Sequence, residues 1–139
     1  MTTSMDGQKT TRLAVLAAIL IVAAGVAVWF WNKPQTQPSL EAGRQVAEQF
    51  LGNLNAGRAA DAWASTTAEF KSAQGKESFV AATKADDLFK QPFEFVSAQS
   101  VMVQSQPRAE YVYRTKDGRN LRLVIGREDN AWKVDRYAK

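Results

Sequence analysis

Acidic side chains are the first residues to consider for catalysis, because the 139-residue chain contains neither histidine nor cysteine. Without them the chain lacks the commonest general base, the commonest metal ligand and any thiol nucleophile. Acid–base chemistry would then depend on carboxylates and tyrosines. The acids to weigh are Asp61, Asp86, Asp87, Glu94 and Glu110.

The spacing of these acids favours structural roles for most of them. Asp61 falls in the first turns of a predicted helix, where a carboxylate stabilises the helix dipole. Asp86 and Asp87 are adjacent and flanked by lysines, which is typical of a solvated helix face. Glu110 is predicted opposite Ile125 on the buried side of a hairpin, where burial would raise its pKa. We predict no catalytic, cofactor-binding or metal-binding residue, with Glu110 as the acid to test.

An apolar segment near the N-terminus predicts a membrane anchor that precedes these residues. Residues 13–31, LAVLAAILIVAAGVAVWFW, are uncharged, and a helix of this length matches the bilayer core of roughly 30 Å. Trp29, Phe30 and Trp31 end the segment, where aromatic rings favour the membrane interface. We predict a single transmembrane helix that contacts the lipid bilayer. A cleaved signal peptide cut near residues 25–27, or a buried helix, would be the alternatives.

The charges flanking this segment predict its orientation. Lys9 and Arg12 precede it, so the positive-inside rule makes residues 1–12 a cytoplasmic leader. Residues 32–38, NKPQTQP, then form a short linker, and residues 39–139 form one domain outside the cytoplasm.

Three amphipathic helices are predicted at the start of this domain. Ser39 is a suitable N-cap for the first helix, which Gly57 would end. The apolar spacing predicts a second helix over about residues 59–70 and a third over about 76–89.

Beyond Pro92 the apolar period changes from 3.6 to 2, which predicts strands. Asp117-Gly118 is typical of a two-residue hairpin turn, and Asp129-Asn130 indicates a second turn. Helices followed by strands predict an α+β fold, with an antiparallel meander packed on the helices.

The predicted turns assign side chains to the two faces of the sheet. A two-residue turn at Asp117-Gly118 pairs Val112 with Leu123 on the side of the helices. The opposite face would then be rich in tyrosine and basic residues, as many protein interfaces are. An ordinary solvated strand surface is the alternative. This predicted partner face comprises Tyr111, Tyr113, Arg122, Lys133 and Tyr137.

The basic character of the C-terminal segment does not by itself indicate nucleic-acid binding. From Arg108 onward, nine basic residues are interspersed with five acidic ones, and they form no Lys/Arg block. We therefore predict a solvated surface and no nucleic-acid partner.

At the level of motifs, residues 39–139 resemble a known superfamily. An opening AEQFLGNLNAGRAADAW, a third helix entered through an aromatic residue and a final strand AWKVDRY carry the similarity. They resemble the nuclear transport factor 2-like (cystatin-like cone) superfamily, and within it small membrane-anchored bacterial members of unknown function. The stretch 84–108 departs from those narrower families. The resemblance implies a cone-shaped domain of three helices on a curved antiparallel sheet, at the bacterial inner (plasma) membrane.

Three functions are compatible with this plan. The leading expectation is a non-catalytic binding or scaffold domain that meets a protein partner or a second copy of itself. Its plan is similar to that of the inner-membrane scaffold component of type IV secretion systems. A pocket for a small apolar ligand and a carboxylate–tyrosine isomerase or dehydratase are the alternatives. The walls of such a pocket, or otherwise simply core residues, would be Trp63, Phe70, Phe79, Phe95 and Trp132.

Overall fold

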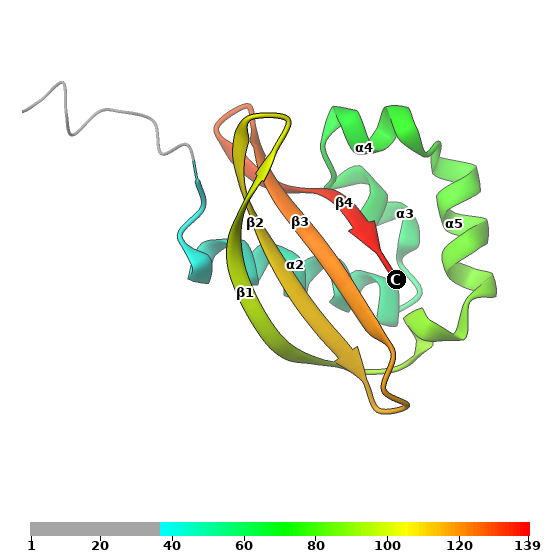
Figure 1. Cartoon of the computed structure of the whole chain (residues 1–139). Helices are drawn as coiled ribbons and strands as arrows, with labels where there is room; N and C mark the ends of the chain where they lie inside the picture. The colour runs from blue at the N-terminus through cyan, green and yellow to red at the C-terminus, as the bar shows by residue number, and fades with distance from the viewer. Residues whose placement is uncertain (1–36) are drawn as a thin grey trace, which may run out of the picture. The chain divides into compact units, whose positions relative to one another are not determined.

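A computed structural model describes residues 37–139 as an α+β domain in which helices pack on a four-stranded antiparallel sheet (Figure 1). The predicted leader, the anchor with its aromatic end at residues 29–31, and most of the linker lie outside the described residues. Across 37–139, no helix is both long and apolar enough to cross a bilayer.

The helices come first in the chain and the strands follow, as the sequence predicts. The helical elements are α2 (Leu40–Asn55), α3 (Ala59–Ala64), α4 (Ala68–Ala73), α5 (Lys76–Ala85) and the 3-10 turn η1 (Asp87–Lys90). The strands are β1 (Phe93–Val103), β2 (Gln106–Thr115), β3 (Asn120–Glu128) and β4 (Ala131–Ala138).

The helix predicted over 59–70 is in fact two short helices. Three hydroxyl residues interrupt it, because such side chains compete for the backbone groups that a helix needs. The Thr66 hydroxyl donates to the carbonyl of Trp63, whereas Thr67 caps α4 by accepting from the Phe70 amide at 3.1 Å. Thr66 also forms a parallel bridge with Val134, which attaches the break to the edge of the sheet.

The β3–β4 turn confirms the predicted two-residue loop. Glu128 pairs with Ala131, and both Asp129 and Asn130 adopt positive φ angles, as a type I′ turn requires.

The β2–β3 turn is one residue longer than predicted, and this corrects the assignment of faces. The Gly118 amide donates to the carbonyl of Thr115, and the Thr115 amide donates to the carbonyl of Arg119. Gly118 has a φ of +86°, so the loop is a three-residue turn with glycine in the left-handed position. Val112 therefore pairs with Arg122 and not with Leu123. A shift of one residue moves every β2 side chain to the other face.

The prediction that the tyrosines belong to the partner face is consequently wrong. Tyr111 and Tyr113 are 0% and 2% exposed and face the helices. A bulge between Val124 and Ile125 alters the register of β4, and Tyr137 contacts the core rings of Phe70, Phe79 and Phe89. Arg122 is exposed, whereas Lys133 is half-buried and paired with Glu128.

Aromatic rings fill the space between the helices and the sheet. Phe70 and Phe79 meet edge to face with centroids 5.5 Å apart, and Phe50 lies 6.1 Å from Phe79. Such contacts exclude water and add to the burial energy of each ring. The centre of the domain is therefore packed, and hollows in the surface lie at its margins.

Gly43 in α2 permits the closest approach of that helix to the sheet. The Tyr111 hydroxyl donates to the carbonyl of Leu40 at 2.9 Å. A Cβ atom on Gly43 would lie 2.1 Å from the same hydroxyl oxygen. We expect Gly43→Ala to destabilise the fold by about 1–3 kcal/mol, since the helix or Tyr111 must move. Urea unfolding provides the measurement.

Gly52 is the matched control for this prediction. It lies in the same helix with nothing within 4 Å of an added Cβ. Gly52→Ala should stabilise the fold by about 0.5–1 kcal/mol through helix propensity alone. Similar effects of the two substitutions would contradict the proposed close contact.

The β2–β3 turn also predicts a dependence of stability on pH. A hydrogen bond from the Thr115 hydroxyl, followed by one from the Gln91 amide and then the Arg119 guanidinium, lowers the pKa of Asp117 to about 2. Because the pKa of Asp117 is lower in the folded state, its ionised carboxylate stabilises the fold at pH values above the unfolded pKa near 3.8. This stabilisation is lost as the pH falls toward 2. Asp117→Asn should therefore reduce the free energy of unfolding at pH 7, and its difference from wild type should shrink between pH 4 and 2. A constant difference across that interval would refute the linkage.

Candidate functional site

The acids singled out in the sequence lie outside the two hollows described below. Asp61 is exposed and 3.8 Å from Arg58, and Asp87 pairs with Lys90 at 2.7 Å. Glu94 is exposed on β1. Each is solvated or engaged in a surface ion pair, which makes none of them a poised acid or base.

Asp86 has a structural role at the start of η1. Its carboxylate accepts from the Leu88 amide and pairs with Lys139 and Arg119. The hydrogen bond with the Lys139 ammonium, then the one with the backbone amide, lowers the pKa of Asp86. This carboxylate stays ionised and links the C-terminus to the helix layer.

The position predicted for Glu110 is wrong, for the same reason as the tyrosines. It pairs with Val124, not Ile125, and lies on the sheet face away from the helices. Its carboxylate accepts from the Gln99 amide at 2.9 Å. Glu110 is therefore not enclosed in the apolar core.

The five aromatic residues predicted as pocket or core walls do not surround one cavity. Phe70 and Phe79 lie in the packed centre. Trp63 is half-buried and donates from its indole to the carbonyl of Gln74 at 2.8 Å, which ties α3 to the end of α4. Phe95 is 37% exposed, and Trp132 is half-buried. Among residues 37–139, no group of three or more acids could hold a metal ion.

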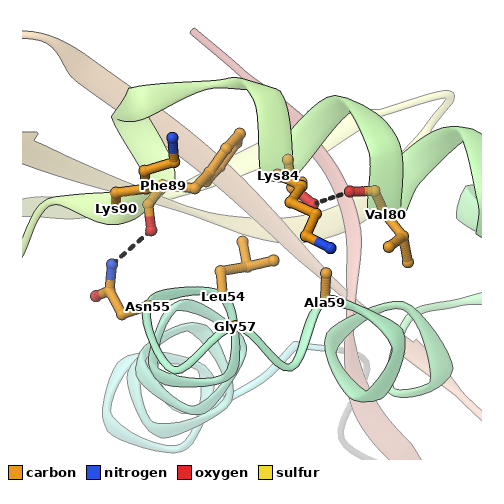
Figure 2. Close-up of a pocket in the computed structure, with 9 residues that line it drawn as sticks. Leu54, Asn55, Gly57, Ala59, Val80, Lys84, Phe89 and Lys90 are labelled. Atoms are coloured by element: carbon orange, nitrogen blue, oxygen red, sulfur yellow. Dashed lines mark hydrogen bonds between the residues drawn. The ribbon is translucent and has the colours of Figure 1, made fainter.

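A hollow of about 260 Å³ lies between the end of α2, the start of α3, and α5 with η1 (Figure 2). We call it the α2–α5 pocket. Its surface is mainly apolar, and no acidic side chain contributes to it. The residues that form it are Leu54, Asn55, Gly57, Ala59, Val80, Thr83, Lys84, Phe89 and Lys90.

Local sequence explains how these elements form a pocket. Gly57, with a φ of +73°, reverses the chain after α2, so that α3 starts beside α2. Asn55 then fixes the opposite wall, because its side-chain amide donates to the carbonyls of Phe89 and Gln91 at 2.8 and 2.7 Å. The pocket is thus held open between a glycine turn and an asparagine clamp.

Most of the polar groups around this pocket already have partners. Thr83 donates to the carbonyl of Phe79 at 2.9 Å, and Lys90 pairs with Asp87. Lys84 has neither a hydrogen bond nor an ion pair within the part of the chain that the structure describes. In Figure 2 its ammonium extends toward the space between Leu54 and Ala59. The pocket therefore combines an apolar floor with one unneutralised positive charge.

A second hollow of about 300 Å³, which we call the Tyr113 pocket, lies on the other side of Asn55 between α2 and β1. Arg44 lies 4.2 Å above the ring of Phe95 and pairs with Glu48 at 2.7 Å. The Tyr113 hydroxyl is buried without a hydrogen-bond partner among the described residues. Burial, then the nearby charge of Glu48, raises the pKa of Tyr113, so its phenol stays protonated. The residues that form this pocket are Arg44, Glu48, Leu51, Gly52, Asn55, Phe93, Phe95 and Tyr113.

A buried ion pair at the β4 edge of the sheet has a structural origin. Asp135, at the β4 bulge, is 4% exposed and accepts from the Thr67 hydroxyl at 3.0 Å. Arg108 reaches it across Gly126, with its Nε 3.9 Å from the carboxylate. The two charges neutralise each other beside the break between α3 and α4. Thr67 lies at the end of this break, where it caps α4. This cluster fastens the helix layer to the last strand.

Of the five predicted pocket or core walls, Phe95 lines the Tyr113 pocket, but sequence reasoning missed most of the other residues that define these hollows. Arg44, Glu48 and Lys84 read as ordinary charged helix positions, and Asn55 as part of a helix end. The only sequence signal was the Gly57 turn, which indicated where α2 stops but not what it faces.

The fold and the hollows define an α+β domain with helices packed on a four-stranded antiparallel sheet and pockets at its margins. The sequence matches no protein-family model and no curated protein.

Proposed function

We propose that this protein is a membrane-tethered, extracytoplasmic binding domain without catalytic activity, and that it binds an apolar group in the α2–α5 pocket. The single observation that carries the proposal is the pocket itself. It is concave, mainly apolar and built from four separate helical elements. Concave apolar surfaces with a few polar groups are the usual form of ligand sites.

Membership of the nuclear transport factor 2-like superfamily is part of the proposal. It is supported by helices that precede a four-stranded meander and by the motif residues of α2 that enter the core. Ala47, Phe50, Leu51 and Leu54, all named in the resemblance, are buried. Because side chains fill the interior of such a cone, its ligand pockets would lie at the edges of the domain.

Tethering at a bacterial inner membrane is supported by the sequence of residues 13–31 and by the basic residues that precede it. With a linker of seven residues, 32–38, the domain would work close to the bilayer surface.

Binding is favoured over carboxylate–tyrosine catalysis by the state of the acids. In the Tyr113 pocket, the carboxylate that lies near the buried tyrosine is Glu48. Arg44 holds it at 2.7 Å, and its side chain is 49% exposed, so it is neutralised and hydrated. A general base needs a free carboxylate aimed at the substrate.

Filling the pocket tests the proposal. Val80 is half-buried on α5, and Val80→Trp would occupy the hollow with an indole. In the full chain in lipid nanodiscs, we expect octanol to shift the amide NMR resonances of Leu54 and Lys84. Val80→Trp should weaken that response roughly tenfold or more, a loss of about 1.4 kcal/mol.

Val96→Trp provides the control, because Val96 is 43% exposed on β1 and outside the pocket. It should leave octanol binding unchanged. An equal response in Val80→Trp and wild type would exclude the α2–α5 pocket as the site.

A scaffold that acts by self-association is the second candidate function, and one observation favours it. Within residues 37–139, the helices cover only one face of the sheet (Figure 1). The other face carries exposed Arg122 together with Glu110, so two copies could pair opposite charges across a two-fold axis. The tyrosines first expected there are core residues, so Tyr113→Glu would test folding and not association.

Charge reversal at Arg122 is the appropriate test. If this face associates, wild type should sediment as a larger species than Arg122→Glu in the same detergent, because the substitution places like charges opposite each other. Lys116→Glu, in the exposed β2–β3 turn, is the control and should sediment as wild type does. Identical sedimentation of all three proteins would eliminate the homodimer.

A further inference from the structure

We infer that the α2–α5 pocket takes the chain of an aliphatic carboxylate, with the Lys84 ammonium holding its head group. This inference rests on the proposed function and names the class of ligand for the same site.

The apolar surfaces of the pocket select the tail of the ligand. Leu54 and Phe89 are 6% and 3% exposed, and Ala59 is 9% exposed, so they present rigid walls of the core. Val80 completes the apolar surface from α5. At about 260 Å³ the pocket is smaller than those that hold drug-sized ligands. A short, flexible hydrocarbon chain suits this volume better than a fused ring system.

The donors and acceptors around the pocket exclude ligands rich in hydroxyl groups. The side-chain Nδ2 of Asn55 already donates to two backbone carbonyls, and the Thr83 hydroxyl already donates to the carbonyls of Phe79 and Val80, so neither is free to donate to a ligand. A sugar or a nucleoside would have to bury polar groups without partners, which costs free energy for each group.

The charge of the pocket selects the head group. Lys90 is neutralised by Asp87 at 2.7 Å, and no acid contributes to the lining. Lys84 therefore supplies one net positive charge at the rim, directed toward the apolar floor (Figure 2). A single charge complements a carboxylate better than a phosphate that carries nearly two. Because Lys84 is exposed, the carboxylate can keep part of its hydration while the chain is buried.

The experiment compares octanoate, octanol and octyl phosphate by calorimetric titration into the full chain in lipid nanodiscs. The same nanodiscs carrying Val80→Trp measure uptake by the lipid itself. Octanoate should bind wild type more tightly than octanol or octyl phosphate does. Lys84→Gln should weaken octanoate roughly two- to fivefold, as expected for a partly exposed ion pair, and leave octanol unchanged.

Two further variants separate the Lys84 interaction from a general effect of charge. Lys76→Gln removes a lysine from the other end of α5, and Lys84→Arg keeps the charge in place. Both should bind octanoate as wild type does.

The outcomes distinguish this inference from the proposed function. Three outcomes would overturn the inference of a carboxylate head group and leave the proposal of an apolar ligand intact. They are equal affinity for octanoate and octanol, tighter binding of octyl phosphate, or no effect of Lys84→Gln. Uptake of octanoate and octanol equal to that of Val80→Trp nanodiscs would overturn both.

Discussion

The three-residue turn between Thr115 and Arg119 determines which side chains of β2 face the helices. Gly118 can adopt the left-handed conformation that this turn needs without steric cost. The resulting register directs Tyr111 and Tyr113 inward, and Tyr111 then meets α2 where Gly43 leaves room for it. The arrangement of the helix layer on the sheet thus follows from one loop of three residues.

Because aromatic rings fill the interior of the domain, its pockets lie at the margins. In a domain of about one hundred residues the aromatic side chains supply much of the buried apolar area. Since Phe50, Phe70, Phe79 and Tyr137 contact one another, they are committed to the core. The α2–α5 pocket forms where α2 ends and the chain turns into α3, whereas the Tyr113 pocket lies between α2 and the sheet. Their walls combine core side chains with charged helix residues, which suits binding better than chemistry.

Sequence patterns predicted the order of elements and the β3–β4 turn, but not the β2–β3 register. Asp-Gly occurs both in two-residue type I′ turns and in three-residue loops that end in glycine, so the dipeptide alone does not fix the count. The break at Thr66 was missed because the apolar spacing continues through the hydroxyl residues that cause it, and the bridge to the distant Val134 that holds it on the sheet has no sequence signal. Lys84 illustrates the same limit for the site, since a lysine in the last turn of a helix is expected whatever lies opposite it.

The α2–α5 pocket joins two helices that differ in how many residues they bury. On one side Leu54 belongs to α2, which buries five of its residues. On the other, α5 buries only Phe79 and Thr83 among its ten residues. Elements with few buried contacts open at lower free energy than the rest of a fold. A ligand that packs Val80 against Leu54 would add apolar contacts where α5 has fewest, so binding should stabilise this helix more than any other element.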